Sequence, residues 1–519
     1  MAALLFLPLI GERTLFISDE ARYALLARNM VEHGHWLVPH IGDEVHMEKP
    51  PGYAWAIALI AWLRGGRITE LASVLPAALS GIGAVAMTVA LGGRLFGGAA
   101  GIVAGLVLAT SFGFFIHARM ALADMTVTFC VAGGLWAFWR ADAEPRRAGW
   151  FMALFYGFLA LGLSAKGPFA LMPLLIVTVF LLGDGGWRRL TALRPVTGAT
   201  VLGAIISPWA VAFALHRQSY VRDVVVGDFG VHFGIWDGLH EILFPLGPLG
   251  LEFLPWVVLV PAAIAGGGGR AADDALRRRF RFLVGWASTY IVLVTLSSHK
   301  RDRYLLAVYP ALALMIGWLI AHWHASRHRR GARASLLLCA ATVIASALAL
   351  FVPVPVQDEF ALYLPETITE AVAPATVLLA GAIILIVAAR AGRVTAGFIA
   401  LTLAAAFLLA YATQSYVPRF NRVYDVKRFS ALLNETVPPG APLVSFGYAR
   451  LSIDLYSGRE PILMRHVEPL QALLRERGAV YVFAEPRGWR IIDAANVARW
   501  ERIAEISLAG RSVTLARTR

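Results

Sequence analysis

The sequence has few charged residues and few cysteines for its length. Only 16% of its 519 residues are charged, whereas 58% are hydrophobic, and a soluble protein of this size could not bury so much apolar surface. The two cysteines, Cys130 and Cys339, lie inside long apolar runs. Neither a disulfide framework nor a thiolate metal site is therefore expected. The sequence also has no visible repeat of roughly 20–50 residues and no matching halves, which many transporters show.

Long apolar runs are abundant. Each has about 17–25 residues, the length at which an α-helix crosses the hydrocarbon core of a bilayer. The predicted spans lie near residues 71–95, 99–117, 123–141, 150–165, 168–183, 196–216, 251–269, 280–298, 304–321, 335–354, 374–390 and 394–412. The stretch 1–10 is too short to span and lacks the basic start of a signal peptide, so it is interpreted as the end of a further helix. The pattern predicts an all-α polytopic membrane protein with about 13 spans.

Arginines gather in alternate connections between the predicted spans. They are Arg94, Arg140, Arg146, Arg147, Arg188, Arg189, Arg194, Arg270, Arg277, Arg278, Arg279, Arg327, Arg329, Arg330, Arg333, Arg390 and Arg393. The positive-inside rule makes this face cytoplasmic, so the other connections and the C-terminal tail are predicted to lie outside. The formal charge of +13 therefore mostly reflects the arginines that orient the protein in the membrane. It gives little support to nucleic-acid binding.

Two long outer loops, residues 10–70 and 217–250, interrupt the helical region, and a polar tail follows it. Helical patterns in the tail alternate with short apolar runs at Pro442–Phe446, Val480–Phe483 and Val513–Leu515. This organisation predicts a transmembrane domain over residues 1–420 and a small soluble α/β domain over residues 421–519. The role of the tail is left open between acceptor docking and a stabilising cap.

Six cations collect on the predicted outer face, against the usual charge bias of such loops. They are Lys49, Arg119, Lys166, Lys300, Arg301 and Arg303. Snorkelling of the side chain explains any one of them, but it does not explain why all six lie on the same face. Ionisable groups at membrane depth usually line a cavity and carry function.

Carboxylates occur near these cations at Asp19, Glu20, Glu48 and Asp124. Asp19 and Asp124 could each be only a helix cap, and Glu48 with the double proline after it could only mark a rigid turn. A carboxylate at the interface is also a candidate general base, or a group that orients a sugar hydroxyl. Cations beside carboxylates suit a phosphate ester whose leaving group must be stabilised, directly or through a divalent ion.

Several short motifs occur in an order that resembles one known superfamily. They are Asp19-Glu20, Glu48-Lys49-Pro50-Pro51-Gly52, Ala118-Arg119 with Asp124, Lys166-Gly167-Pro168, and Lys300 to Tyr304 before Leu305 and Pro310. Over residues 1 to about 420 the set resembles the aminoarabinose transferase and protein O-mannosyltransferase superfamily, the polyprenyl-phosphate-dependent glycosyltransferases of GT-C architecture. The likeness is strongest to the bacterial aminoarabinose (lipid A) transferase branch.

The resemblance implies a bacterial inner-membrane enzyme whose active site faces the periplasm. Such an enzyme moves a sugar from a polyprenyl-phosphate carrier to an acceptor, which is lipid A, a protein or another glycan, and it is expected to be a monomer. The resemblance implies that Asp19 is the candidate catalytic carboxylate and that Asp124 supports it, and Glu20 is taken as a further catalytic candidate beside Asp19. It also implies that Lys49 and Tyr304 approach the donor phosphate. The other outer cations, Arg119, Lys166, Lys300, Arg301 and Arg303, are assigned to the same phosphate.

A metal site is less well defined. The resemblance implies that Glu48 contacts a divalent ion, with Zn²⁺, Mg²⁺ and Mn²⁺ as the candidates. Relatives carry a His or Asn followed by Arg-Phe in the second long outer loop, whereas this chain has Gly227-Asp228-Phe229-Gly230-Val231-His232-Phe233. The second ligand could be Asp228 or His232, or no stable metal site exists. A lone histidine such as His232 is more often structural unless Glu48 is close.

Two other classes compete with the transferase interpretation. A flippase or transporter for lipid-linked sugars would also combine many spans with cations near a lipid phosphate. The long first outer loop, the soluble tail and the lack of visible repeats argue against it. A non-catalytic membrane scaffold is the second alternative, and it would make the six outer cations accidental.

Overall fold

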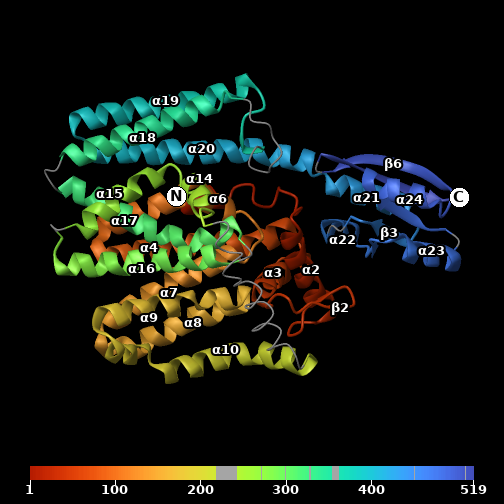
Figure 1. Ribbon diagram of the computed structural model, residues 1–519, viewed down its shortest axis with the longest axis horizontal. Coiled ribbons are helices and arrows are strands. Elements are labelled where there is room, and N and C mark those ends of the chain that lie inside the picture. Colours follow the sequence, from red (N-terminus) through yellow and green to blue (C-terminus); the bar gives the residue numbers. More distant parts are fainter. Residues whose placement is uncertain are drawn as a thin grey trace.

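The computed structural model describes residues 1–217, 242–269, 272–297, 300–325, 329–352, 362–448, 451–477, 479–508 and 510–519. The described residues form a block of long helices and a smaller α/β domain, with the red N-terminal elements α2, α3 and β2 near the junction between them (Figure 1). The predicted positions Asp228 and His232 lie outside the described residues.

Helices of the block occupy all twelve positions predicted after the first apolar segment. They are α4 (Glu70–Phe96), α5 (Gly98–Ala109), α6 (Phe112–His117), α7 (Asp124–Ala143), α8 (Ala148–Lys166), α9 (Met172–Gly185), α10 (Pro195–His216), α14 (Leu246–Glu252), α15 (Val260–Gly268), α16 (Asp274–Leu296), α17 (Tyr309–Ala325), α18 (Arg329–Ala349), α19 (Ile368–Ala391) and α20 (Val394–Val423). The segment at residues 1–10 contains only the short α1 (Ala2–Phe6).

Short 3-10 helices join several of these elements. They are η1 (Pro145–Arg147), η2 (Pro168–Leu171), η3 (Trp187–Leu193), η5 (Trp256–Leu259) and η6 (Asp302–Val308). Local sequence sets several helix starts. The Thr69 hydroxyl accepts a hydrogen bond from the Ala72 N–H at the start of α4, and the Asp273 carboxylate accepts one from the Leu276 N–H at the start of α16. Both side chains satisfy backbone donors that a helix N-terminus otherwise leaves unpaired.

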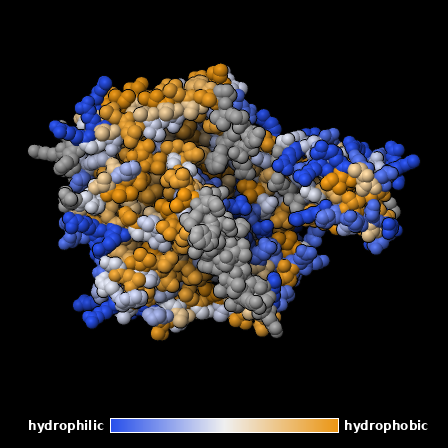
Figure 2. All heavy atoms as spheres, in the orientation of Figure 1, coloured by the Kyte–Doolittle hydropathy of each residue, from blue (hydrophilic) through white to orange (hydrophobic). Residues whose placement is uncertain are grey.

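Nine helices among the described residues are long and apolar enough to cross a membrane, or ten if α14 and the η5–α15 segment form one bent span. Beyond these, α5 is a shorter apolar helix and α7 has 20 residues. The sides of the helical block are largely orange in the hydropathy view, and hydrophilic blue gathers at its left end and over the small domain at the right (Figure 2). The chain is an all-α polytopic membrane protein with a C-terminal α/β domain, as predicted.

Ion pairs at one end of the block join connections that the arginine pattern places on one face. Asp142 accepts from Arg189 at 2.5 Å and from Arg278 at 2.7 Å, and Asp184 accepts from Arg278 at 2.9 Å and from Arg281 at 2.8 Å. We call these five residues the inner ion cluster. They tie together the end of α7, the end of α9, η3 and the start of α16.

The smaller domain is built on a five-stranded sheet of order β4-β3-β5-β7-β6. Its strands are β3 (Leu443–Phe446), β4 (Ile462–Met464), β5 (Tyr481–Ala484), β6 (Trp500–Leu508) and β7 (Arg511–Thr518). Strand β3 pairs in parallel with β4 and β5, whereas β7 pairs antiparallel with β5 and β6. The predicted runs at 442–446, 480–483 and 513–515 correspond to β3, β5 and part of β7.

Helices cover both faces of this sheet. They are α21 (Val426–Thr436), α22 (Leu451–Ser457), α23 (Val467–Glu476) and α24 (Pro486–Ala495). Phe429 and Phe483 share one core cluster, whereas Val482 and Trp489 share the other. Neighbouring residues of β5 therefore point to opposite faces, as the alternation of side chains along a strand requires.

The first outer loop forms α2 (Ser18–His33), α3 (Gly52–Leu63) and a small antiparallel pair of strands, β1 (His40–Ile41) and β2 (Glu44–Val45). The C-terminal domain is attached to this loop by polar contacts. The Leu15 N–H donates to the Tyr456 hydroxyl at 2.9 Å, and Arg28 donates to the Leu455 carbonyl at 3.1 Å. Helix α20 continues to Val423, past the predicted boundary at residue 420, so the domain is also held by a continuous helix.

Candidate active site

Asp19 lies in the first turn of α2, and its carboxylate is held from two sides. Its Oδ1 accepts a hydrogen bond from Arg22 at 2.6 Å, one helical turn further along, and its Oδ2 accepts one from Arg303 at 2.7 Å. A carboxylate in the first turn of a helix is also favoured by the helix dipole. Local sequence and a distant arginine thus fix the position of this side chain together.

Asp124 occupies the equivalent position in α7, and it is 6% exposed. It forms an ion pair with Lys166, the last residue of α8. The Lys166 ammonium also lies over the Tyr304 ring, 4.5 Å from its centroid, which is a cation–π distance. The three predicted residues Asp124, Lys166 and Tyr304 therefore lie together.

Arg303 connects the two carboxylates. Besides its bond to Asp19, its Nε lies 3.6 Å from Asp124 Oδ2. This Nε is buried and has no hydrogen-bond partner among the residues the structure describes. The guanidinium of η6 therefore spans acidic residues at the starts of α2 and α7, which are more than 100 positions apart in the chain.

The Glu48-Lys49-Pro50-Pro51-Gly52 motif brings Lys49 to the same place. A Cβ added at Gly52 would lie 2.6 Å from the Ser164 carbonyl oxygen, and one added at Gly167 would lie 3.6 Å from the Pro50 ring. The motif therefore packs closely against the end of α8, next to Lys166, and only glycine allows the approach at position 52. The Lys49 charge acts electrostatically on both Asp19 and Lys166.

We call Asp19, Arg22, Lys49, Asp124, Lys166 and Arg303 the outer ion cluster. It contains four cations and two carboxylates, so its formal charge is +2. Partial burial acts to raise the pKa of Asp19, but Arg303, Arg22 and Lys49 outweigh this effect and hold the pKa below its ordinary value. The Asp19 carboxylate therefore stays ionised at neutral pH, and the surplus of cations favours an anionic ligand.

Helix α7 separates the outer and inner ion clusters. It begins at Asp124 and reaches Asp142 after 18 residues, which corresponds to about 27 Å along a helix axis. That distance is close to the thickness of a bilayer hydrocarbon core, about 30 Å. The connections that carry the two clusters therefore lie at opposite ends of the helical block, as the charge pattern predicted.

Two predicted site residues lie elsewhere. Glu20 is fully buried, where it pairs with Arg13 and accepts a hydrogen bond from the Ala121 N–H at 2.9 Å. Arg119 donates to the carbonyl oxygens of Leu5 and Phe6 at 3.1 and 3.0 Å, at the end of α1. Both charges are used in these internal contacts, so Glu20 and Arg119 hold the first segments together and are not part of the outer ion cluster. Their predicted roles in catalysis and phosphate binding stay predictions.

The remaining predicted residues lie close in sequence to members of the outer ion cluster. The Glu48 side chain is 73% exposed, with His46 Nε2 3.9 Å away, and it does not take part in the cluster of possible metal ligands found among the described residues. Arg301 is exposed and Lys300 is half-buried, immediately before η6. The Glu48 metal contact remains a prediction, and its proposed partners Asp228 and His232 lie in the part of the chain that is not described.

The sequence reasoning missed two features of this region. Arg22 was not selected, although its spacing of three residues from Asp19 on a helix places the two side chains on one face. His117, Glu252 and Asp302 form a group of possible metal ligands within the described residues. They come from three separate segments, so no spacing in the sequence could have linked them.

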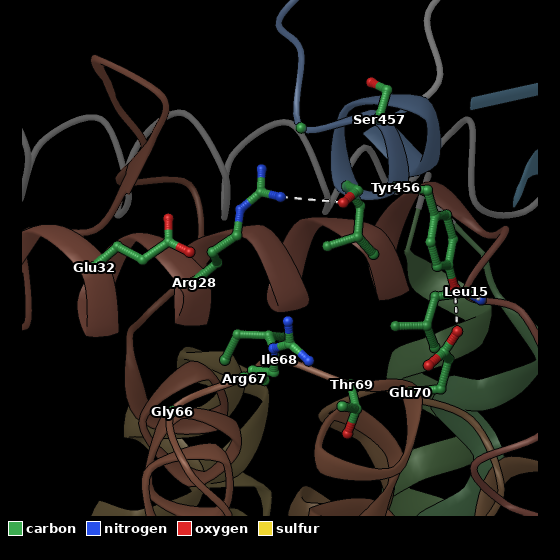
Figure 3. A pocket seen from close by; sticks show the side chains of 12 residues that line it. Leu15, Arg28, Glu32, Gly66, Arg67, Ile68, Thr69, Glu70, Tyr456 and Ser457 are labelled. Carbon is green, nitrogen blue, oxygen red and sulfur yellow. Dashed lines mark hydrogen bonds between the residues drawn. The ribbon is translucent and has the colours of Figure 1, made fainter. Parts of the chain in front are cut away.

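A cleft of about 520 Å³ lies where the C-terminal domain meets the first outer loop. Its lining includes Arg28, Glu32, Arg67 and Glu70, with Leu455 and Tyr456 from the small domain. Figure 3 shows Arg28 reaching towards α22 and Tyr456 meeting Glu70, with Arg67 below them. The Tyr456 hydroxyl donates to Glu70 at 3.1 Å. The cleft therefore offers charged groups of both signs on the outer side of the molecule.

The chain is similar to known proteins over part of its length. A family described as dolichyl-phosphate-mannose-protein mannosyltransferase matches residues 48–211. An undecaprenyl phosphate-alpha-4-amino-4-deoxy-L-arabinose arabinosyl transferase from Edwardsiella ictaluri is 29% identical over 323 residues, and one from Pseudomonas aeruginosa is 30% identical over 328 residues. Each alignment covers 60% of this chain and 56% or 57% of the relative. The chain thus spans a little over half the length of these curated relatives.

Solved structures show the same fold. The crystal structure of ArnT from Cupriavidus metallidurans bound to undecaprenyl phosphate matches with a TM-score of 0.77 at 18% identity, over 99% of this chain and 96% of that one. The archaeal oligosaccharyltransferase AglB from Archaeoglobus fulgidus matches with a TM-score of 0.55 at 13% identity, over 93% and 68%. These findings confirm that the chain has the GT-C fold and resembles the aminoarabinose transferase and protein O-mannosyltransferase superfamily.

Proposed function

We propose that the protein is a glycosyltransferase of the bacterial inner membrane, with its active site facing the periplasm. It transfers a sugar from a polyprenyl-phosphate carrier to an acceptor at that face. The observation that carries this proposal is the outer ion cluster, in which Arg303 joins the carboxylates of Asp19 and Asp124 beside Lys49 and Lys166. The names of the similar proteins support the polyprenyl-phosphate donor. The arginines at the inner end of the block support the orientation in the membrane.

The surplus of positive charge accounts for the chemistry expected of the donor. When the bond between sugar and phosphate breaks, negative charge grows on the departing phosphate. Fixed cations placed where that charge develops lower the barrier without having to reorganise. Lys49 makes no ion pair with any described residue, so we assign it the first contact with the phosphate. Lys166 and Arg303 are oriented by the carboxylates and complete the positive field.

Asp19 has a different task. Its lowered pKa makes it a weak base, because the efficiency of proton removal falls as the pKa moves below the working pH. A phosphate acceptor is already ionised and needs no base. We therefore infer that Asp19 orients Arg303 and the sugar, and that the preferred acceptor presents an anionic oxygen. A hydroxyl acceptor would instead require Asp19 to take a proton.

The acceptor head group is assigned to the cleft beside the C-terminal domain. Arg28 lies nine residues after Asp19 on the same helix α2, which is about 13 Å along its axis. An acceptor held between Arg28 and Arg67 would therefore lie one head-group length from the reacting centre. This placement gives residues 421–519 the acceptor-docking role, because Leu455 and Tyr456 form one wall of the cleft.

The test uses purified protein in lipid nanodiscs with a polyprenyl-phosphate sugar and lipid A as acceptor. Wild-type protein should release free polyprenyl phosphate, and Asp19→Asn should release it about 100-fold more slowly, because the group that orients Arg303 and the sugar is lost. The matched control is Asp184→Asn in the inner ion cluster, which should keep the wild-type rate. A flippase would move the intact lipid and release no polyprenyl phosphate. Wild-type turnover by Asp19→Asn would remove Asp19 from the chemistry.

A further inference from the structure

Three side chains beside the outer ion cluster converge on one point. His117 is the last residue of α6, Glu252 is the last residue of α14 and Asp302 is the first residue of η6. One possible ligand atom from each lies within 4.8 Å of the other two. His117 is 6% exposed and Glu252 is 2% exposed, and Asp302 is half-buried. Two carboxylates and an imidazole are thus gathered away from water.

Each of the three side chains is held in place by a hydrogen bond to the surrounding protein. His117 Nδ1 lies 2.8 Å from the Gly113 carbonyl oxygen. A carbonyl only accepts, so Nδ1 carries a hydrogen, and Nε2 is the ring nitrogen left to bind a metal. The Tyr309 hydroxyl donates to Glu252 Oε2 at 2.7 Å, and the Arg303 N–H donates to Asp302 Oδ1 at 2.8 Å. Hydrogen bonds to a ligand side chain from groups that do not touch the metal fix the orientation of that ligand.

Glycine at position 113 is required for this arrangement. A Cβ added there would lie 2.4 Å from Glu252 Oε2, which is too close for any atom that is not bonded to it. The absence of a side chain lets α14 bring its carboxylate against α6 and the His117 ring. The close approach is therefore built into the sequence at a residue that does not itself offer a ligand.

We propose that His117, Glu252 and Asp302 bind a divalent transition-metal ion, either Zn²⁺ or Mn²⁺. A buried carboxylate and a half-buried one beside an imidazole lone pair repel one another, and buried charges are normally paired or coordinate a metal. A cation between them removes that penalty. One imidazole with two carboxylates suits Zn²⁺ or Mn²⁺, whereas Mg²⁺ and Ca²⁺ prefer oxygen ligands alone. Three protein ligands would leave a position for water or substrate.

The ion would also position the outer ion cluster. Asp302 directly precedes Arg303, whose guanidinium spans Asp19 and Asp124, and His117 acts electrostatically on Asp124. Fixing Asp302 fixes the start of η6 and therefore the direction of the Arg303 side chain. Only this positioning role rests on the proposed function. Metal binding itself does not, so the two can fail separately.

The experiment measures metal content and does not depend on turnover. Purified full-length protein in nanodiscs is stripped with chelator, loaded with ZnCl₂ or MnCl₂, desalted and analysed by inductively coupled plasma mass spectrometry. Wild type should retain one ion per chain, and the double variant His117→Gln with Asp302→Asn should bind at least about 10-fold more weakly. Glu44→Gln, at an exposed carboxylate of β2, is the matched control and should retain the ion.

X-ray absorption spectroscopy of the metal-loaded wild type identifies the ligands directly. This test remains valid even if the variants fail to fold. The spectrum should show one imidazole in a shell otherwise made of oxygen. No ion retained by wild type, an ion retained by the double variant, or an ion lost from Glu44→Gln would each overturn the proposal. A shell with no imidazole, or with more than one, would overturn it as well.

Discussion

The two ion clusters at opposite ends of the helical block are built differently. In the inner ion cluster, three arginines converge on Asp142 and Asp184 through several direct contacts, and Arg278 donates to both carboxylates. In the outer ion cluster, one arginine is shared between Asp19 and Asp124, and Lys49 pairs directly with neither. Every charge of the inner ion cluster is therefore in a direct ion pair, whereas the outer ion cluster retains one cation, Lys49, that makes no ion pair with any described residue.

This difference separates a structural role from a functional one. Multiple contacts to each carboxylate fix helix ends relative to one another, which is what the connections of a helical bundle need. A cation held near carboxylates but not consumed by them remains able to bind an added anion. Both clusters have more cations than carboxylates, so net charge alone would not have distinguished them. The presence of a cation that makes no ion pair with any described residue does, and of the two clusters the outer one has such a cation, Lys49.

The largest effect should come from replacing the shared arginine. Arg303→Met removes the group that spans Asp19 and Asp124, so we expect turnover to fall about 100- to 1000-fold, as it does when one transition-state hydrogen-bond donor is lost. Sugar transfer in nanodiscs is the measurement. Arg278→Met in the inner ion cluster is the counterpart and should leave turnover within about two-fold. Equal losses in both variants would remove the distinction between the clusters.

Lys49→Met should weaken binding of the donor more than it lowers turnover at saturating donor concentration. Loss of one charge-assisted contact to a phosphate is worth about 1.5–3 kcal/mol, which corresponds to about 10- to 100-fold in affinity. We expect KM for the polyprenyl-phosphate sugar to rise by that factor while the thermal midpoint stays unchanged, since Lys49 makes no ion pair with a described residue. A lower thermal midpoint with unchanged KM would make Lys49 a structural residue.

Asp454 on α22 extends the comparison to a carboxyl that lacks the arginines of either cluster. Burial raises its pKa to about 7, Glu460 adds to this effect, and Arg28 opposes it. Because the folded-state pKa lies above the unfolded value near 4, the folded protein holds the proton between these values, and stability falls as pH rises through that window. We expect wild type to be about 1 kcal/mol more stable at pH 6 than at pH 8.

Thermal unfolding of Asp454→Asn at the two pH values tests this expectation. The amide does not titrate, so the variant should lose most of the difference between pH 6 and pH 8. A variant that keeps the full wild-type pH dependence would assign the effect to another group.

Asp184→Asn should show the smallest effect. Its carboxylate is 10% exposed and its arginine partners are 30–53% exposed, so solvent screens much of the interaction and we expect a loss of about 1 kcal/mol in stability. Thermal unfolding in nanodiscs measures it, and donor affinity should not change. A change in donor affinity would mean that the inner ion cluster communicates with the outer one.

Much of the fold could be predicted because membrane helices depend on local composition. Apolar runs predicted the position of every described helix of the block from α4 to α20, and alternating arginines predicted the two faces that α7 connects through Asp124 and Asp142. The three predicted strands of the tail were found because short apolar runs between helical patterns are typical of α/β domains. The part of α20 after residue 412, where the predicted span ends, was missed because the helix continues to Val423 after its composition becomes polar.

The candidate site was predicted only in part, and the reason is physical. Asp19, Asp124, Lys166 and Arg303 were selected from their place on the outer face, and the structure brings them together. Glu20 and Arg119 have the same place in the sequence pattern, but their side chains point into the protein. The direction in which a side chain points depends on how distant segments pack against each other. The charge pattern of the loops gives no information about that packing.

Binding of polyprenyl phosphate is the most direct test of the central claim that the outer ion cluster holds a lipid phosphate. Native mass spectrometry of nanodisc-released protein would compare wild type, Lys49→Met and the inner control Arg278→Met over a range of lipid concentrations. The account predicts that wild type and Arg278→Met bind with equal affinity and that Lys49→Met binds at least about 10-fold more weakly. Equal affinity in all three proteins would contradict it.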